Sequence, residues 1–72
     1  MDEATRMQLH DLAAIRRCCD DALLYAARLA AAQPPLPQAE RTVLCELHIP
    51  RLRIAREDAA LMARRLRDGV TT

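Results

Sequence analysis

The chain has 72 residues, of which 51% are hydrophobic and 29% charged, with a formal net charge of +1. This balance is typical of a globular or coiled-coil protein and disfavours disorder outside the ends of the chain. A single aromatic residue and a single glycine disfavour a β-sheet, and the near-neutral charge disfavours a protein that coats nucleic acid or anionic lipid. The length allows one domain, residues 1–72, with a small core.

The first predicted element is a helix over about residues 3–32. The stretch lacks proline and glycine and is rich in Ala, Leu and Arg, while Asp2 and Glu3 suit the positive end of the helix dipole. Arg16 stands four residues before Asp20, which predicts an exposed ion pair along the helix. At 100° per residue one side is apolar and should face a second helix. That side carries Leu12, Ile15, Cys19, Ala22, Leu23, Ala26, Leu29 and Ala30.

A proline-rich turn is predicted over residues 33–37. Proline lacks an amide proton and disfavours the α conformation in the residue before it, so the first helix should stop here. Pro37 is expected at the first position of a second helix over about residues 37–68, with Gly69 as its C-terminal cap. The predicted fold is therefore all-α, a two-helix antiparallel hairpin.

The second helix should be kinked or broken near Pro50, which removes one main-chain hydrogen bond. Beyond it, alternating steps of three and four residues predict a coiled-coil-like seam, which Cys45 and His48 continue backwards. The seam residues are Leu52, Ala55, Ala59, Met62 and Leu66.

A second apolar set on the same helix, Val43, Leu47, Ile54 and Leu61, lies on a different face. This helix is thus apolar over more of its circumference than one partner helix can cover. Self-association into a four-helix bundle or docking on another helical protein would cover the surplus. The residues expected to bind a partner are Leu12, Ile15, Leu23, Leu47, Ile54, Leu61 and Met62.

Three cysteines and two histidines, one of which is His10, are the candidate metal or redox groups. An odd number of cysteines, with Cys18 and Cys19 adjacent, does not fit a disulfide framework and points to a reducing, cytoplasmic compartment. Cys45 and His48 could approach Cys19 across the hairpin, but cysteine in tight helix contacts more often acts as a small apolar side chain. No metal or cofactor is predicted, and a thiol or metal sensor remains a second alternative.

No catalytic pattern is present, since the chain has no serine, no glycine-rich phosphate loop and no paired nucleophile and base. An enzyme is therefore not predicted. The arginines of the last third alternate with acidic residues, as on a solvated helix face, which makes nucleic acid an unlikely partner. No apolar run reaches the length of a membrane span and no export signal is visible, so a membrane partner is not expected.

A long helix, a proline turn at Pro34 to Pro37 and a second helix of small and leucine-type residues resemble the small bacterial co-chaperones of type III secretion needle subunits. Those hairpins dock on a tetratricopeptide-like chaperone and help to hold the needle subunit unpolymerised. The resemblance implies the same role here. The expected function is a non-enzymatic adaptor or chaperone subunit; the alternative is a homodimeric regulator or inhibitor acting on a transcription factor or nucleic acid.

Overall fold

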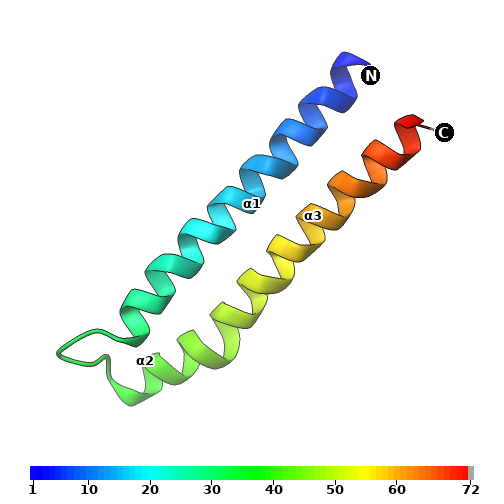
Figure 1. Ribbon diagram of the computed structural model, residues 1–72. Helices are drawn as coiled ribbons and strands as arrows, with labels where there is room; N and C mark the ends of the chain where they lie inside the picture. Colours follow the sequence, from blue (N-terminus) through cyan, green and yellow to red (C-terminus); the bar gives the residue numbers. More distant parts are fainter. Residues whose placement is uncertain (72) are drawn as a thin grey trace.

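Two helical arms run antiparallel along a rod of 52 × 16 × 13 Å in the computed structural model, which describes residues 1–71 and the side chains of residues 1–69 (Figure 1). The first arm is α1, Glu3–Ala30. The second is continuous but irregular and consists of α2 (Gln38–Val43), a π-helical turn η1 (Leu44–His48) and α3 (Ile49–Thr71). The two ends of the chain lie at the same end of the rod. The predicted all-α hairpin is confirmed.

The first arm begins at a side-chain cap. The Asp2 carboxylate accepts a hydrogen bond from the Thr5 backbone amide at 2.7 Å, which satisfies one of the free donors at the helix start. Hydrogen bonding to Thr5, through its side chain and its backbone, lowers the pKa of Asp2. At the other end, the Ala31 amide donates to the Ala27 carbonyl, and the helix stops at Ala30, two residues before the predicted end. The prolines that follow explain this stop.

The second arm departs from the prediction at both ends. Pro37 is the residue before the helix, with ψ 149°, so the helix starts at Gln38 and not at Pro37. Gly69 was expected to cap the arm after residue 68, and this was wrong because α3 continues to Thr71. A glycine cap requires a positive φ, and no glycine among the described residues has one.

The irregularity near Pro50 is confirmed, and it takes the form of a wide turn and not a break. The Ile49 amide donates to the Leu44 carbonyl, five residues back, where an α-helix would use the fourth. Pro50 follows directly as the second residue of α3. The π turn therefore lies where the proline cannot donate a hydrogen bond, and it adds one residue to the spacing between the half-buried Leu44 and Ile49.

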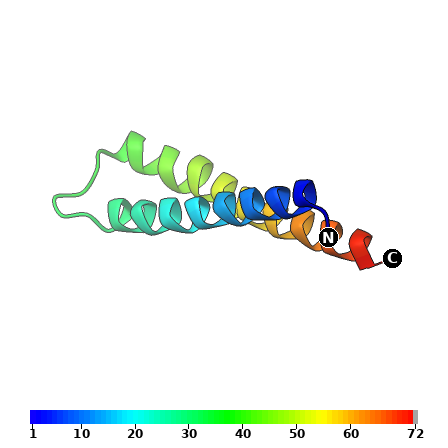
Figure 2. The same cartoon turned by 90° about the horizontal axis from the view of Figure 1, so that it is seen from above.

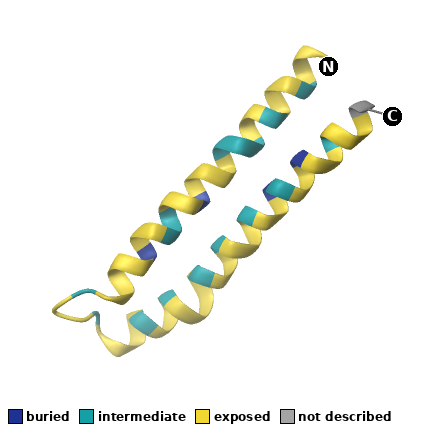
Figure 3. Ribbon diagram, viewed as in Figure 1, coloured by how far each residue is buried: buried dark blue, intermediate teal, exposed yellow. Residues whose placement is uncertain are grey.

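Small side chains form the contact between the arms. The buried residues among positions 1–69 are Cys19 and Ala26 on α1, and Ala59 and Ala63 on α3. In Figure 3 these residues lie along the inner sides of the two arms. Side chains this small let two helix backbones approach closely, but they bury little apolar area. Half-buried leucines flank them at Leu9, Leu12, Leu23, Leu52 and Leu66.

The predicted seam on α3 was wrong at two positions and in its backward extension. Ala55 and Met62 are exposed, and Arg56 and Ala63 take their places, so the seam is Leu52, Arg56, Ala59, Ala63 and Leu66. The predicted and the observed seam both follow alternating steps of three and four residues. Hydropathy favoured the predicted seam, because it contains no arginine. The aliphatic stem of an arginine can nevertheless pack at an interface while its charged end reaches out. Cys45 and His48 are exposed as well, because the π turn brings Leu44 and Ile49 inward instead.

One ion pair connects the arms in the described part of the chain. Nη1 of Arg56 lies 3.1 Å from a carboxylate oxygen of Asp20. Asp20 therefore pairs across the hairpin and not with Arg16 along its own helix. Both side chains keep 40–49% of their surface exposed, so the pair contributes less than about 1 kcal/mol. Its position in the seam suits a role in aligning the two arms.

In the described chain, no helix combines the length and the apolar character needed to cross a membrane.

Candidate functional site

Most of the large apolar side chains face outward. Eleven of those at positions 1–69 are more than one-third exposed, whereas every buried residue there is alanine or cysteine. A small helical hairpin normally turns such side chains towards its own seam. Seven of the eleven form two groups that define where a partner can bind, and the other four, Met1, Met7, Leu24 and Tyr25, belong to neither group.

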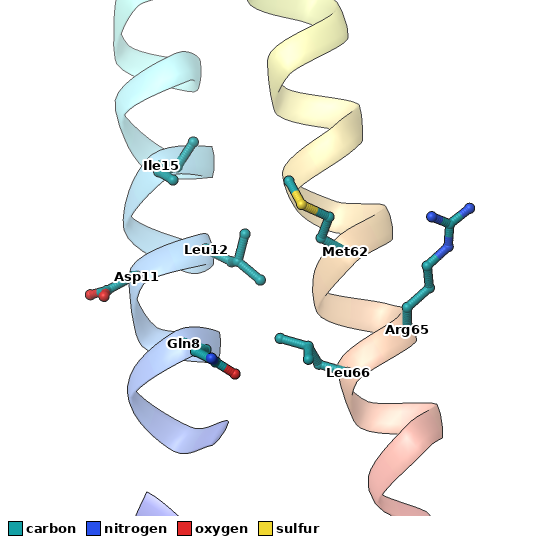
Figure 4. Close-up of a pocket in the computed structure, with 7 residues that line it drawn as sticks. All are labelled: Gln8, Asp11, Leu12, Ile15, Met62, Arg65 and Leu66. Carbon is teal, nitrogen blue, oxygen red and sulfur yellow. The ribbon is translucent and has the colours of Figure 1, made fainter. Parts of the chain in front are cut away.

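The first group lines one side of the hairpin, along the groove between the arms. Near the chain ends, a hollow of about 550 Å³ opens between α1 and α3 (Figure 4). Leu12 and Leu66 point towards each other across it, while Asp11 and Arg65 lie on its two outer edges. The floor is therefore apolar and the rim is charged, with one charge of each sign. The large apolar lining residues are Leu12, Ile15, Met62 and Leu66.

Two further hollows extend this surface along the same side. A hollow of about 410 Å³ shares Ile15 with the first and adds Cys18, Ala22 and Leu52, and one of about 420 Å³ lies at the turn end against Leu29. Ile15, Ala22 and Leu29 follow one another at seven-residue intervals, so they form one stripe along α1. We call this side of the hairpin the grooved face. On α1 it runs from Leu12 to Leu29, and on α3 it includes the residues that line the same hollows, Leu52, Met62, Arg65 and Leu66. At the turn end it also includes Leu36, Ala39, Glu40, Val43, Leu44 and His48.

The opposite side of the hairpin is polar. A hollow of about 320 Å³ there is lined by Arg16, Arg17 and Arg67 around Asp20, with alanines and leucines beneath. Cys45 directly follows the half-buried Leu44 and lines none of the four hollows described here. The hairpin is thus two-sided, with an apolar grooved face and a basic face.

The second group of exposed side chains lies on the outside of the second arm. Leu47, Ile54 and Leu61 stand at seven-residue intervals and are 38%, 58% and 40% exposed, so all three are available to a partner. Ile54 and Leu61 each lie two residues, or about 200°, from the seam residues on either side, which places them away from α1. None of the three lines a hollow described here. We call these three residues the outer ridge.

No family model, curated protein or solved structure matches this chain. The two surfaces are therefore the basis for a functional assignment.

The seven residues predicted to bind a partner divide between these surfaces. Ile15 and Met62 lie on the grooved face, with half-buried Leu12 at its floor. Leu23 is half-buried beside the seam and so belongs in part to the hairpin itself. The remaining three are the outer ridge. The hollow at the turn end was not predicted from the sequence. Its wall includes Leu36 of the proline turn, and helical periodicity does not predict where a residue in a turn lies.

The cysteines and histidines do not gather. Cys19 is buried in the seam, while Cys18 and Cys45 are exposed. His48 lines the turn-end hollow near Leu29, and His10 lies 3.3 Å from the neighbouring Asp11 at the exposed surface. The described residues contain no group of three or more His, Cys, Asp or Glu side chains able to hold a metal ion. The conceivable approach of Cys45 and His48 to Cys19 is therefore not observed.

Proposed function

We propose that this chain is a non-enzymatic helical protein-interaction module, an adaptor or chaperone subunit of the bacterial cytoplasm, which binds a helical partner protein through its outer ridge. A type III secretion co-chaperone is the specific form of this role that the architectural resemblance implies. The observation that carries the proposal is the row of exposed large apolar side chains at Leu47, Ile54 and Leu61 on the side of the second arm away from α1.

The outer ridge has the spacing of a helix-binding surface. Ile54 and Leu61 lie seven residues apart in the regular helix of α3 and so return to one face after two turns, whereas the π turn shifts Leu47 sideways from that line. The three anchors span fourteen residues, or about 21 Å along the arm. Burial of each leucine or isoleucine side chain contributes about 1.5–3 kcal/mol. Three such anchors are enough for a specific interface of modest affinity.

Charged residues surround the anchors and would form the rim of such an interface. Arg51, Glu57 and Asp58 lie three or four residues from Ile54, and Arg64 and Arg65 lie at the same distances from Leu61. An apolar centre with a polar rim is the usual anatomy of a protein interface. The mixed signs would select acidic partner residues opposite Arg51 and Arg64, and basic ones opposite Glu57 and Asp58.

The proposal is tested by polar substitution on the outer ridge. A partner co-purified from the native cell and then prepared in pure form should bind the Ile54→Asp and Leu61→Asp variants at least tenfold more weakly, since losing 1.4 kcal/mol is a factor of ten. Circular dichroism should show unchanged helix content in both variants. The matched control is Leu24→Asp, an exposed leucine on α1 at 53%, which should bind normally. Undiminished binding by both ridge variants would contradict the proposal.

A further inference from the structure

The hairpin exposes more surface than a compact protein of its mass. Its accessible surface is 5600 Å² for 8.1 kDa, whereas a compact monomer of that mass exposes about 4,500 Å². The difference is about 1,100 Å². A stable, specific interface removes about 800 Å² from each partner, so the excess is as large as one interface per chain.

The grooved face has the shape that a bundle of four helices requires. A helix in such a bundle contributes its seam residues and one flanking stripe to the common core. On α1 the stripe is Ile15, Ala22 and Leu29, and on α3 exposed Met62 stands beside the seam in the same hollow as Ile15. Both arms therefore turn an apolar stripe to the same side.

The charges favour a second copy as the occupant. A twofold contact joins a surface to itself, so any charges on that surface are complementary only if both signs are present. The grooved face carries both signs, with Asp11 and Arg65 at one end and Glu40 at the other. The basic face does not, because its arginines outnumber Asp20 and two such faces would repel.

We infer that a second copy of this chain covers the grooved face, so that the free protein is a homodimeric four-helix bundle. The outer ridge stays exposed in this dimer, since it lies on the other side of the second arm. The inference therefore goes beyond the proposed function and does not rest on it. Cys18 lines the covered surface, whereas Cys45 lies outside it.

The first test is the mass of the reduced protein by sedimentation equilibrium over a concentration series. The expected result is a dimer. Ile15→Asp and Met62→Asp should raise the dissociation constant at least tenfold, and Ile54→Asp on the outer ridge should leave it unchanged. A fully helical monomer at every concentration would overturn the dimer while leaving partner binding by the ridge untouched. A dimer that Ile54→Asp dissociates and Ile15→Asp does not would also overturn it.

A second measurement uses the unmodified chain and so does not depend on how the variants fold. Alkylation of the thiols by a maleimide, mapped by mass spectrometry, should slow at Cys18 as the protein concentration rises through the dimer range. Cys45 is the internal control and should react at a constant rate. Equal behaviour of the two exposed thiols would overturn the inference.

Discussion

Ala59 is the most deeply buried of the four buried residues between the two arms, with only 1% of its surface exposed. A larger side chain at this position must push the helices apart. We expect Ala59→Leu to destabilise the hairpin by about 1–3 kcal/mol, the usual effect of overpacking, which should lower the thermal midpoint by circular dichroism. Ala27→Leu, at an exposed alanine of α1, is the matched control and should change it little. A higher midpoint for Ala59→Leu would show that the seam has unfilled space.

Asp2 provides a pH-dependent cap for α1. Its pKa is below the ordinary value of 3.8 in the folded chain, so its stabilisation is complete above that value and disappears as the pH falls through the lowered folded pKa. The Thr5 amide proton should therefore titrate with a midpoint below 3.8 in an NMR pH series, as the first turn frays. Asn also accepts this hydrogen bond but does not titrate, so Asp2→Asn should remove the transition. If the Thr5 amide of the Asp2→Asn variant shows the same pH transition, the transition belongs to a different carboxyl group.

Single positions in the seam could be predicted only where the side chain is small or apolar and also lies on the predicted inner face of its helix. Cys19, Ala26 and Ala59 are small, lie on the predicted inner sides and are buried. Arg56 could not be predicted, because a charged group at a core position is acceptable only when its partner is known, and Asp20 comes from the other arm. Met62 was placed in the seam for its hydropathy, but it is exposed because Ala63 takes the seam position.

At the scale of elements, the π turn accommodates one residue more between Leu44 and Ile49 than the spacing of a regular α-helix allows. The inward positions step from Leu44 in η1 to Ile49 in α3 by five residues, whereas from Ile49 through the α3 seam they step by three and four. Deletion of exposed Glu46 together with Pro50→Ala should restore both the regular spacing and the missing amide donor. We expect this variant to unfold at the same temperature as the parent or higher, because a proline inside a helix costs about 3 kcal/mol.

Deletion of Asp58 is the contrasting control. It removes an exposed residue too, but beyond it every seam residue rotates by about 100°. Ala63 and Leu66 would leave the contact, and loss of the leucine burial alone costs about 1.5–3 kcal/mol. A thermal midpoint for this deletion equal to that of the Glu46 deletion would contradict the proposed role of the π turn.

Element types and approximate ends followed from the sequence, because proline, alanine and apolar periodicity all act locally. The α1 start and the turn at the prolines agree with prediction, and the arm ends differ by one to three residues. The π turn did not follow. Its five residues contain no proline or glycine that would mark it in the sequence. Its causes lie elsewhere: Pro50, after the turn, lacks an amide hydrogen-bond donor, and the contact with α1 requires the wider spacing between Leu44 and Ile49.

For the whole molecule, the sequence predicted a surplus of apolar surface and placed Leu47, Ile54 and Leu61 on a different face from the seam, but it did not predict the grooved face. The surplus follows from counting apolar positions on each helix. The positions of the two exposed surfaces depend on which residues of α3 pack against α1. With the seam at Arg56 and Ala63, Met62 turns to the grooved face, and Ile54 and Leu61 turn outward.

The two chain ends lie together, at the opposite end of the rod from the proline turn (Figures 1 and 2). The four buried side chains all come from the helices, and of the turn residues 33–37 only Leu36 is half-buried while the others are exposed. The turn thus acts as a tether that holds the arms at high local concentration. A circularly permuted chain, with a short flexible linker between the present ends and new ends between Pro35 and Leu36, should keep the same helix pairing and both exposed surfaces.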